Sequence, residues 1–186
     1  MEQRKSITAL PSAHPRLSRA LAFCLGLVFT AGFAPLGLSL LVIFVLVPLL
    51  YVFHTAAPRN AFWHGFWFVV GAFLSGTYWI HISVSGFGGA PWYVALLLMF
   101  ILVSIMATYV GITGWLVSRL TGSRPLLLFA VAPSAWVLIE WLRGWLFTGF
   151  PWLAIGYAQS DSYLAGWAPL LGIYGSSFAR SEEHTS

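Results

Sequence analysis

Long apolar stretches separated by short polar connections dominate this chain. A helix needs about 20 apolar residues to cross a bilayer, and five stretches reach that length. They cover residues 17–34, 36–53, 62–80, 92–117 and 125–142. A further apolar stretch at 165–179 is too short for a complete crossing. The pattern predicts an all-α integral membrane protein, a polytopic helical bundle with five full transmembrane helices (residues 17–142) and a truncated sixth.

The composition supports a membrane protein. Hydrophobic residues make up 59% of the 186 residues, charged residues only 8%, and the mean hydropathy is +0.84. Soluble domains carry about a quarter charged residues. The first apolar stretch follows a basic arm, as a signal peptide would. However, a second stretch follows at once across Pro35, which favours an uncleaved helical hairpin.

The basic residues predict an orientation. Seven of the eight Lys and Arg residues before residue 180 fall in alternate connections: Arg4, Lys5, Arg16, Arg19, Arg59, Arg119 and Arg124. By the positive-inside rule this side is cytoplasmic. Residues 1–16 are then a disordered cytoplasmic arm, and Arg143 alone lies on the periplasmic side. The bases form no stripe, so the chain is expected to be membrane-embedded without a nucleic-acid partner.

Residues 143–164 form the connection after the fifth apolar stretch. They read "RGWLFTGFPWLAIGYAQSDSYL", which is too rich in Gly and Pro for a plain helix. They are also too aromatic for an ordinary solvated loop. We expect a periplasmic segment that is re-entrant or lies in the membrane interface.

Catalytic and metal-binding patterns are scarce. The single cysteine, Cys24, sits inside an apolar run with no nearby group in sequence to activate it. The five histidines lack ligand spacing, so neither a metal site nor a cofactor is expected. A Ser-His-Asp triad would need His81 and Asp161, but no GxSxG motif accompanies them. We therefore assign no catalytic residue.

Glu140 is the residue in a membrane stretch that requires explanation, because a carboxylate there is costly. Arg143 lies three residues further along and so on the same face of a helix. The two side chains are expected to act as a supporting pair. They could simply orient the end of the helix at the interface. Alternatively, they could brace the aromatic loop or meet a lipid headgroup.

The segment after residue 148 carries a distinctive motif. It reads "GFPWLAIGYAQSDSYLAGWAPLLGIYGSSF" and resembles apolipoprotein N-acyltransferases. The matching positions in its first part are Gly149, Phe150, Pro151, Trp152, Gly156, Tyr157 and Gln159. The upstream "WVLIEWLR" and the "AGFAPLG" after the first stretch resemble the same family.

The resemblance implies a bacterial inner-membrane acyltransferase. Such enzymes move an acyl chain from a membrane phospholipid to the N-terminal diacylglyceryl-cysteine of an apolipoprotein. Their chemistry uses a Glu, a Lys and a nucleophilic Cys of a nitrilase-like domain that follows the membrane helices. Those three positions have no counterpart here, and Cys24 is on the wrong segment to replace the nucleophile. The chain is thus expected to be an inactive membrane fragment of such an enzyme.

The residues that match the motif are the candidates for lipid or substrate contact. Trp152 is the first choice, with Gly149 and Pro151 shaping its loop and Phe150, Tyr157 and Gln159 beside it. The alternative to this function is a non-enzymatic membrane protein, either a small transporter or a scaffold subunit. No internal repeat of the kind common in transporters is visible.

The last seven residues, "RSEEHTS", contrast with the apolar chain before them. One DNA string that encodes them matches the start of a common short-read sequencing adapter. Residues 180–186 are therefore expected to be a sequencing artefact rather than part of the protein.

Overall fold

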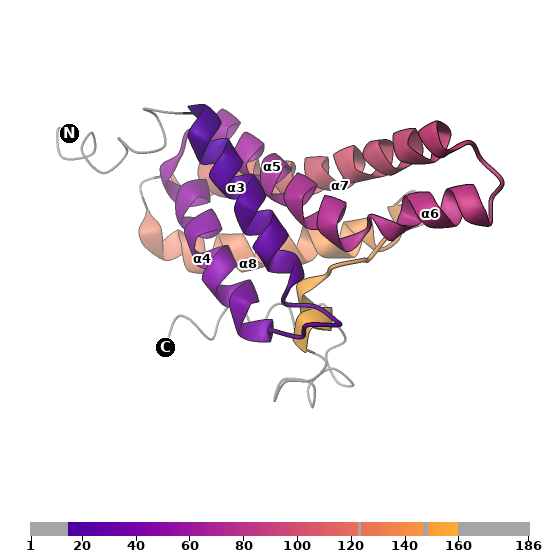
Figure 1. Ribbon diagram of the computed structural model, residues 1–186. Coiled ribbons are helices and arrows are strands. Elements are labelled where there is room, and N and C mark those ends of the chain that lie inside the picture. The colour runs from indigo at the N-terminus through magenta and orange to yellow at the C-terminus, as the bar shows by residue number, and fades with distance from the viewer. Residues whose placement is uncertain (1–14, 123, 147–148, 160–186) are drawn as a thin grey trace.

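The computed structural model describes residues 15–122, 124–146 and 149–159, and every element in them is helical. The elements are α3 (Pro15–Thr30), α4 (Ser39–Thr55), α5 (Pro58–Gly76), α6 (Trp79–Gly86), α7 (Trp92–Thr121), α8 (Pro125–Arg143) and the 3₁₀ helix η2 (Ile155–Gln159) (Figure 1). The predicted all-α class is confirmed. Of the predicted arm, only Pro15 and Arg16 are described, and both belong to α3. The predicted sixth helix (165–179) and the tail (180–186) lie outside the described residues.

The prediction of five full transmembrane helices is wrong for the described part of the chain. Two helices, α7 and α8, are long and apolar enough to cross a membrane by themselves. A third span results only if α5 and α6, which meet at a 53° bend, count as one broken segment. The helices α3 and α4 have 16 and 17 residues, or roughly 24 to 26 Å at 1.5 Å per residue. They are shorter than the hydrocarbon core of about 30 Å.

Helix α5 occupies the centre of the bundle, where it packs against α3, α4 and α7. The α3–α5 contact is close because glycines meet backbone. A Cβ at Gly26 would lie 1.9 Å from the carbonyl oxygen of Phe68, and one at Gly71 would lie 2.2 Å from that of Phe23. Small residues permit such backbone approach between membrane helices. The α3–α5 pair is therefore fixed by shape.

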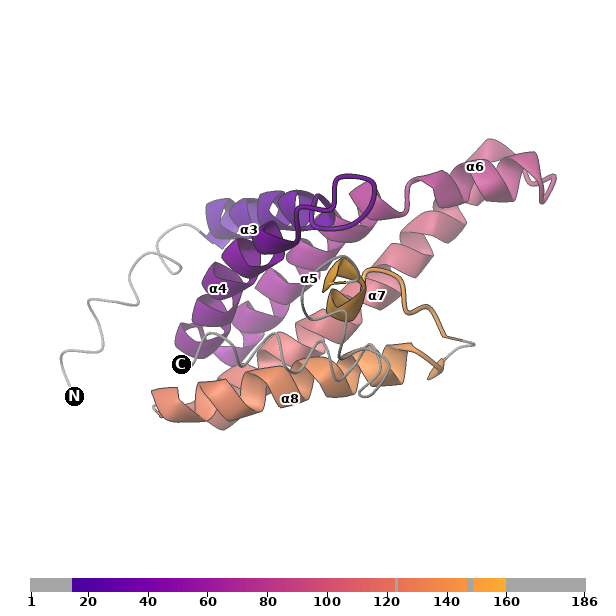
Figure 2. The ribbon, with the colours of Figure 1, turned by 90° about the horizontal axis from the view of Figure 1, so that it is seen from below.

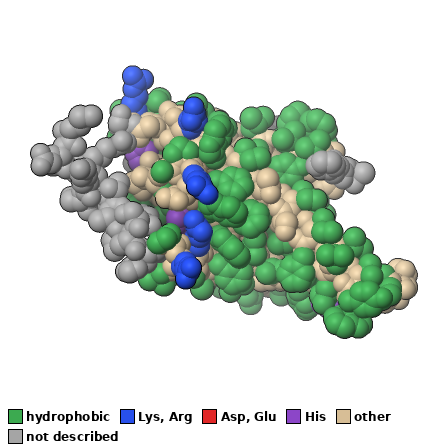
Figure 3. All heavy atoms as spheres, turned by 90° about the horizontal axis from the view of Figure 1, so that it is seen from above, with side chains coloured by type: hydrophobic (Ala, Val, Ile, Leu, Met, Phe, Trp, Pro, Cys, Tyr) green, Lys and Arg blue, Asp and Glu red, His purple; other side chains and the backbone are tan. Residues whose placement is uncertain are grey.

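The basic residues gather at one end of the bundle. We define the basic end by Arg16, Arg19, Arg59, Arg119 and Arg124, at the starts of α3, α5 and α8 and the end of α7. Contacts tie these termini together: the Ser118 hydroxyl donates to the Ala56 carbonyl at 2.7 Å, and the Arg19 guanidinium lies 5.7 Å from the Trp63 ring centroid. On the face drawn in Figure 3, the Lys and Arg side chains form a band at this end, and hydrophobic side chains cover most of the rest.

Helix α6 and the start of α7 project beyond the other helices (Figures 1 and 2). The sequence predicted a span reaching Ile80 and then a connection through residue 91. Instead, α5 ends at Gly76, where the Thr77 hydroxyl donates to the Phe73 carbonyl at 2.5 Å. The chain then bends into α6, which has no buried residue. An eight-residue helix flanked by glycines carries too little periodicity to be predicted from its sequence.

Candidate functional site

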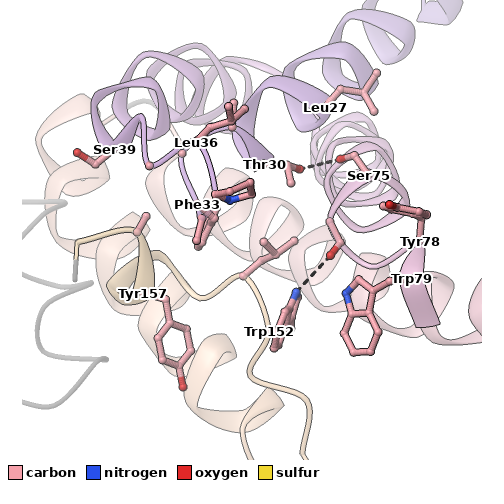
Figure 4. A pocket seen from close by; sticks show the side chains of 18 of the residues that line it. Leu27, Thr30, Phe33, Leu36, Ser39, Ser75, Tyr78, Trp79, Trp152 and Tyr157 are labelled. Carbon is pink, nitrogen blue, oxygen red and sulfur yellow. Dashed lines mark hydrogen bonds between the residues drawn. The ribbon is translucent and has the colours of Figure 1, made fainter. Parts of the chain in front are cut away.

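A cavity of about 910 Å³ opens at the end of the bundle opposite the basic end, which we call the cavity end. Three segments enclose it: the turn after α3, the end of α5 with the start of α6, and residues 151–158. Its larger walls come from Leu27, Phe33, Leu36, Trp79, Trp152 and Tyr157 (Figure 4). None of the described residues that line it is charged. Its size is that of a ligand-binding pocket.

Trp152, in the loop of residues 149–159, forms an aromatic wall of the cavity beside α5. Its indole Nε1 donates to the Gly76 carbonyl at 3.3 Å. Its ring meets Trp79 edge-on, with centroids 5.6 Å apart, and stacks near Phe150 at 6.3 Å. Even with these contacts, Trp152 is 45% exposed. Figure 4 shows the indoles of Trp152 and Trp79 next to each other at the cavity. Trp152 thus has a fixed orientation and a free face.

Two hydroxyl side chains in the cavity wall, those of Thr30 and Ser75, already bind protein atoms. The hydroxyls of Thr30 and Ser75 share a hydrogen bond of 2.7 Å, drawn in Figure 4. Each hydroxyl also lies within 3.1 Å of the Ala72 carbonyl. This pair joins α3 to α5 at the cavity floor. This pair could not be predicted from the sequence, because isolated Ser and Thr residues are common in membrane helices.

The loop that carries Trp152 has two residues with a left-handed backbone. Gly149 has φ +80°, and a Cβ there would lie 2.1 Å from the Gly144 carbonyl oxygen, so only glycine fits. Leu153 adopts φ +56°, which is unusual for a residue with a side chain. The Phe150 amide donates to the Arg143 carbonyl at 3.0 Å. The predicted shaping of this loop by Gly149 therefore has a geometric basis.

Glu140 lies beneath the same loop and is only 4% exposed. Its Oε1 accepts hydrogen bonds from the Trp136 indole at 3.0 Å and from the Ile155 amide at 2.8 Å. Arg143 is equally buried, with its guanidinium 5.6 Å from the Phe73 ring centroid. Both residues thus belong to the interior of the cavity end. Their action as a supporting pair stays a prediction.

The other predicted site residues have mixed placements. Pro151 and Tyr157 line the cavity with Trp152, and Phe150 packs against Phe73 with ring centroids 6.2 Å apart. Gln159 ends η2, and its side chain lies outside the described part. The sequence missed Phe33, Leu36 and Trp79 as cavity residues. Only the "AGFAPLG" match hinted at the first two.

The remaining candidates for chemistry lie apart. Cys24 is a free, exposed thiol on α3. Among the described residues, no three His, Cys, Asp or Glu side chains lie close enough to hold a metal ion. His81 bonds through Nδ1 to the Tyr78 carbonyl, and Asp161 is not among the described residues. The predicted absence of metal, cofactor and catalytic residues stays a prediction.

Comparison with known families decides the relationship. The family model described as the apolipoprotein N-acyltransferase N-terminal domain matches residues 25–180. The chain belongs to the apolipoprotein N-acyltransferase family.

Curated apolipoprotein N-acyltransferases resemble this chain over most of its length. The protein from Vibrio cholerae is 42% identical over 164 residues, which cover 85% of this chain and 32% of that protein. That from Vibrio vulnificus is 39% identical over 160 residues, which cover 85% of this chain and 32% of that protein. That from Methylococcus capsulatus is 39% identical over 159 residues, covering 83% and 31%. The chain therefore spans about a third of the length of the curated relatives it matches.

These relatives are bacterial, and the apolar helices of this chain agree with a bacterial membrane protein. Of the motif residues that carry the family resemblance, Pro151, Trp152 and Tyr157 line the cavity on its loop side.

Proposed function

We propose that this chain is the membrane part of a lipoprotein N-acyltransferase of the bacterial inner membrane. The reaction proposed for the whole enzyme moves an acyl chain from a phospholipid to the N-terminal diacylglyceryl-cysteine of an apolipoprotein. The role proposed for this chain is to hold the acyl chain of a lipid substrate near the membrane surface. The observation that carries this proposal is the uncharged, aromatic-walled cavity at the cavity end.

The cavity suits an acyl chain better than a charged ligand. Its lining among the described residues contains no ion to pair with a headgroup. The hydroxyls of Thr30 and Ser75 are engaged with each other and with α5. Apolar and aromatic surface therefore dominates recognition, and burying apolar groups yields about 25 cal/mol per Å².

The orientation proposed for the chain places the cavity at the periplasmic leaflet. The basic end is opposite the cavity, and the positive-inside rule assigns the basic end to the cytoplasm. Lipid in the outer leaflet would then meet the opening lined by Trp79 and Trp152. The acyl-thioester chemistry that the resemblance implies is proposed for a part of the relatives that this chain does not match.

A chimera tests the proposal directly. The segment of the Vibrio cholerae relative that this chain matches is replaced by the corresponding residues of this chain. Lipoprotein N-acylation is then followed by mass spectrometry in a strain depleted of its own enzyme. Acylation by the chimera supports the proposal, and the same chimera with Trp152→Ala should acylate more slowly.

The alternative of a non-enzymatic transporter makes a different prediction. A folded, membrane-inserted chimera that never acylates would count against the proposal. A transporter would give selective solute flux in liposomes that contain this chain, and a photoreactive phospholipid would not label the cavity. These two results together would favour the transporter over the acyltransferase.

A further inference from the structure

At least three hydrogen bonds attach residues 149–159 to the helices. The Phe150 amide donates to the Arg143 carbonyl at 3.0 Å, and the Trp152 indole donates to the Gly76 carbonyl at 3.3 Å. The third bond, at 2.8 Å, joins the Ile155 amide to Oε1 of Glu140. In the first two bonds a helix carbonyl is the acceptor. In the third the acceptor is a side-chain oxygen, so its position depends on the length of the Glu140 side chain.

The surroundings of Glu140 concentrate its contacts on the oxygen that faces the loop. Trp136 lies one helical turn before it, and its indole donates to the same Oε1 at 3.0 Å. Oε2 is buried and has no hydrogen-bond partner among the described residues. Glu140 is also the only acidic residue in the described part of the chain. A carboxylate buried at this cost calls for a role.

The backbone between Trp152 and Ile155 needs such a contact. Leu153 holds φ +56°, a region that side chains disfavour. Ala154 and Ile155 are buried directly after it. A strained turn persists only where its surroundings fix it, and the bond from Ile155 to Glu140 anchors the end of this turn.

We propose that Glu140 is a positioning residue that sets the place of Trp152. Its Oε1 holds the Ile155 amide, and through the Leu153 turn this bond fixes the aromatic wall of the cavity. The role requires an acceptor at the reach of a glutamate side chain. A negative charge is not required.

Three substitutions separate reach from charge. Glu140→Gln keeps the length and an acceptor oxygen but removes the charge. Glu140→Asp keeps the charge but is one methylene shorter. Glu140→Met fills similar space without an acceptor. Leu138→Ala is the matched control, since Leu138 lies on the same helix as Glu140 but is exposed rather than buried.

The readout is the ¹⁹F spectrum of the whole chain, labelled with 5-fluorotryptophan in lipid nanodiscs. The Trp152 signal is assigned by its absence from Trp152→Phe. We expect it to stay in place in Glu140→Gln and Leu138→Ala and to move in Glu140→Asp and Glu140→Met. Leaving the buried Ile155 amide without its acceptor should lower the ratio of docked to undocked loop by about fivefold or more. All variants are first checked for monodisperse elution.

A Trp152 signal that moves in Glu140→Gln, or stays in place in Glu140→Asp, overturns the proposal. Should Glu140→Met yield no folded protein, the Gln and Asp variants decide alone. The consequence for substrate rests on the proposed function and is measured separately, as labelling of the cavity by a photoreactive phospholipid. Unchanged labelling with a displaced Trp152 leaves the positioning role intact and counts against the lipid role of the cavity.

Discussion

The α3–α5 pair and the 149–159 loop are held in place in opposite ways. The helices meet along backbone surfaces at Gly26 and Gly71, where no larger residue fits. The loop depends on directional contacts, among them the hydrogen bonds of Phe150, Trp152 and Ile155 and the ring contacts of Trp152. The stabilisation from close packing is spread over many atoms, whereas the stabilisation from hydrogen bonds depends on a few donor and acceptor groups. The helix pair should therefore fail by steric clash, and the loop should shift when a single partner is removed.

The largest expected effect is that of Gly26→Ala. Its Cβ would meet the Phe68 carbonyl oxygen at 1.9 Å and force the two helices apart. We expect a loss of about 3 kcal/mol or more in stability, measured as thermal unfolding in detergent by size-exclusion chromatography. Gly86→Ala is the control, because a Cβ there meets nothing within 4 Å. Equal melting temperatures for the two variants would contradict the close packing.

Gly149→Ala should come next, with a loss of about 2 kcal/mol from its left-handed backbone and more from the clash with Gly144. The matched variant is Gly89→Ala, where φ is +65° but the space is open. The Gly89→Ala variant should lose only the stability that the left-handed backbone costs, without a contribution from a clash. The same unfolding assay compares them, and a Gly89 variant as unstable as the Gly149 variant would exclude the steric contribution.

Trp152→Ala should weaken lipid binding without unfolding the bundle. Removing the ring leaves Trp79 without its edge-on partner and opens the cavity wall. We expect phospholipid photolabelling to fall roughly fivefold to tenfold, as for a typical binding hot spot. Trp152→Phe keeps a ring but loses the bond to Gly76. Its photolabelling should fall between that of the unmodified chain and that of Trp152→Ala. Undiminished labelling of Trp152→Ala would contradict the binding of lipid against this cavity wall.

The smallest expected effect is that of Ser75→Ala. It removes one interhelical hydroxyl contact with Thr30, worth about 0.6 kcal/mol in a membrane bundle. Ser104→Ala is the control, since its hydroxyl bonds only within α7. A melting temperature lowered by several degrees in Ser104→Ala as well would show that the Thr30–Ser75 pair is not special.

The sequence predicted the apolar helices best where apolar residues run without interruption. The stretches at 92–117 and 125–142 became α7 and α8 with few changes at their ends. The third stretch was overextended, because the break at Thr77 is set by a local hydrogen bond that apolarity does not reveal. The turn between α3 and α4 was misplaced for a related reason: α3 ends at Thr30 and α4 begins at Ser39, and hydropathy does not show where a turn begins.

For the candidate site, the sequence pointed to single residues but not to their partners. Glu140 stood out because a carboxylate is costly in an apolar helix. Its bond to the Ile155 amide could not be predicted, because every residue except proline carries the same backbone donor. The cavity likewise brings Phe33 and residues more than a hundred positions away into one lining, and a single sequence does not reveal which distant segments come together.

The unequal lengths of the helices have a consequence for the surrounding membrane. Helix α7, with 30 residues, is roughly 45 Å long, whereas α3, with 16, is roughly 24 Å. Lipids adjust to such mismatch by local thinning on the short side and by tilt or thickening on the long side. The short side ends at Thr30, on the rim of the cavity. A bilayer thinned on this side would be thinnest beside the cavity, and on the proposed function this would shorten the distance that a lipid tail travels to leave its leaflet.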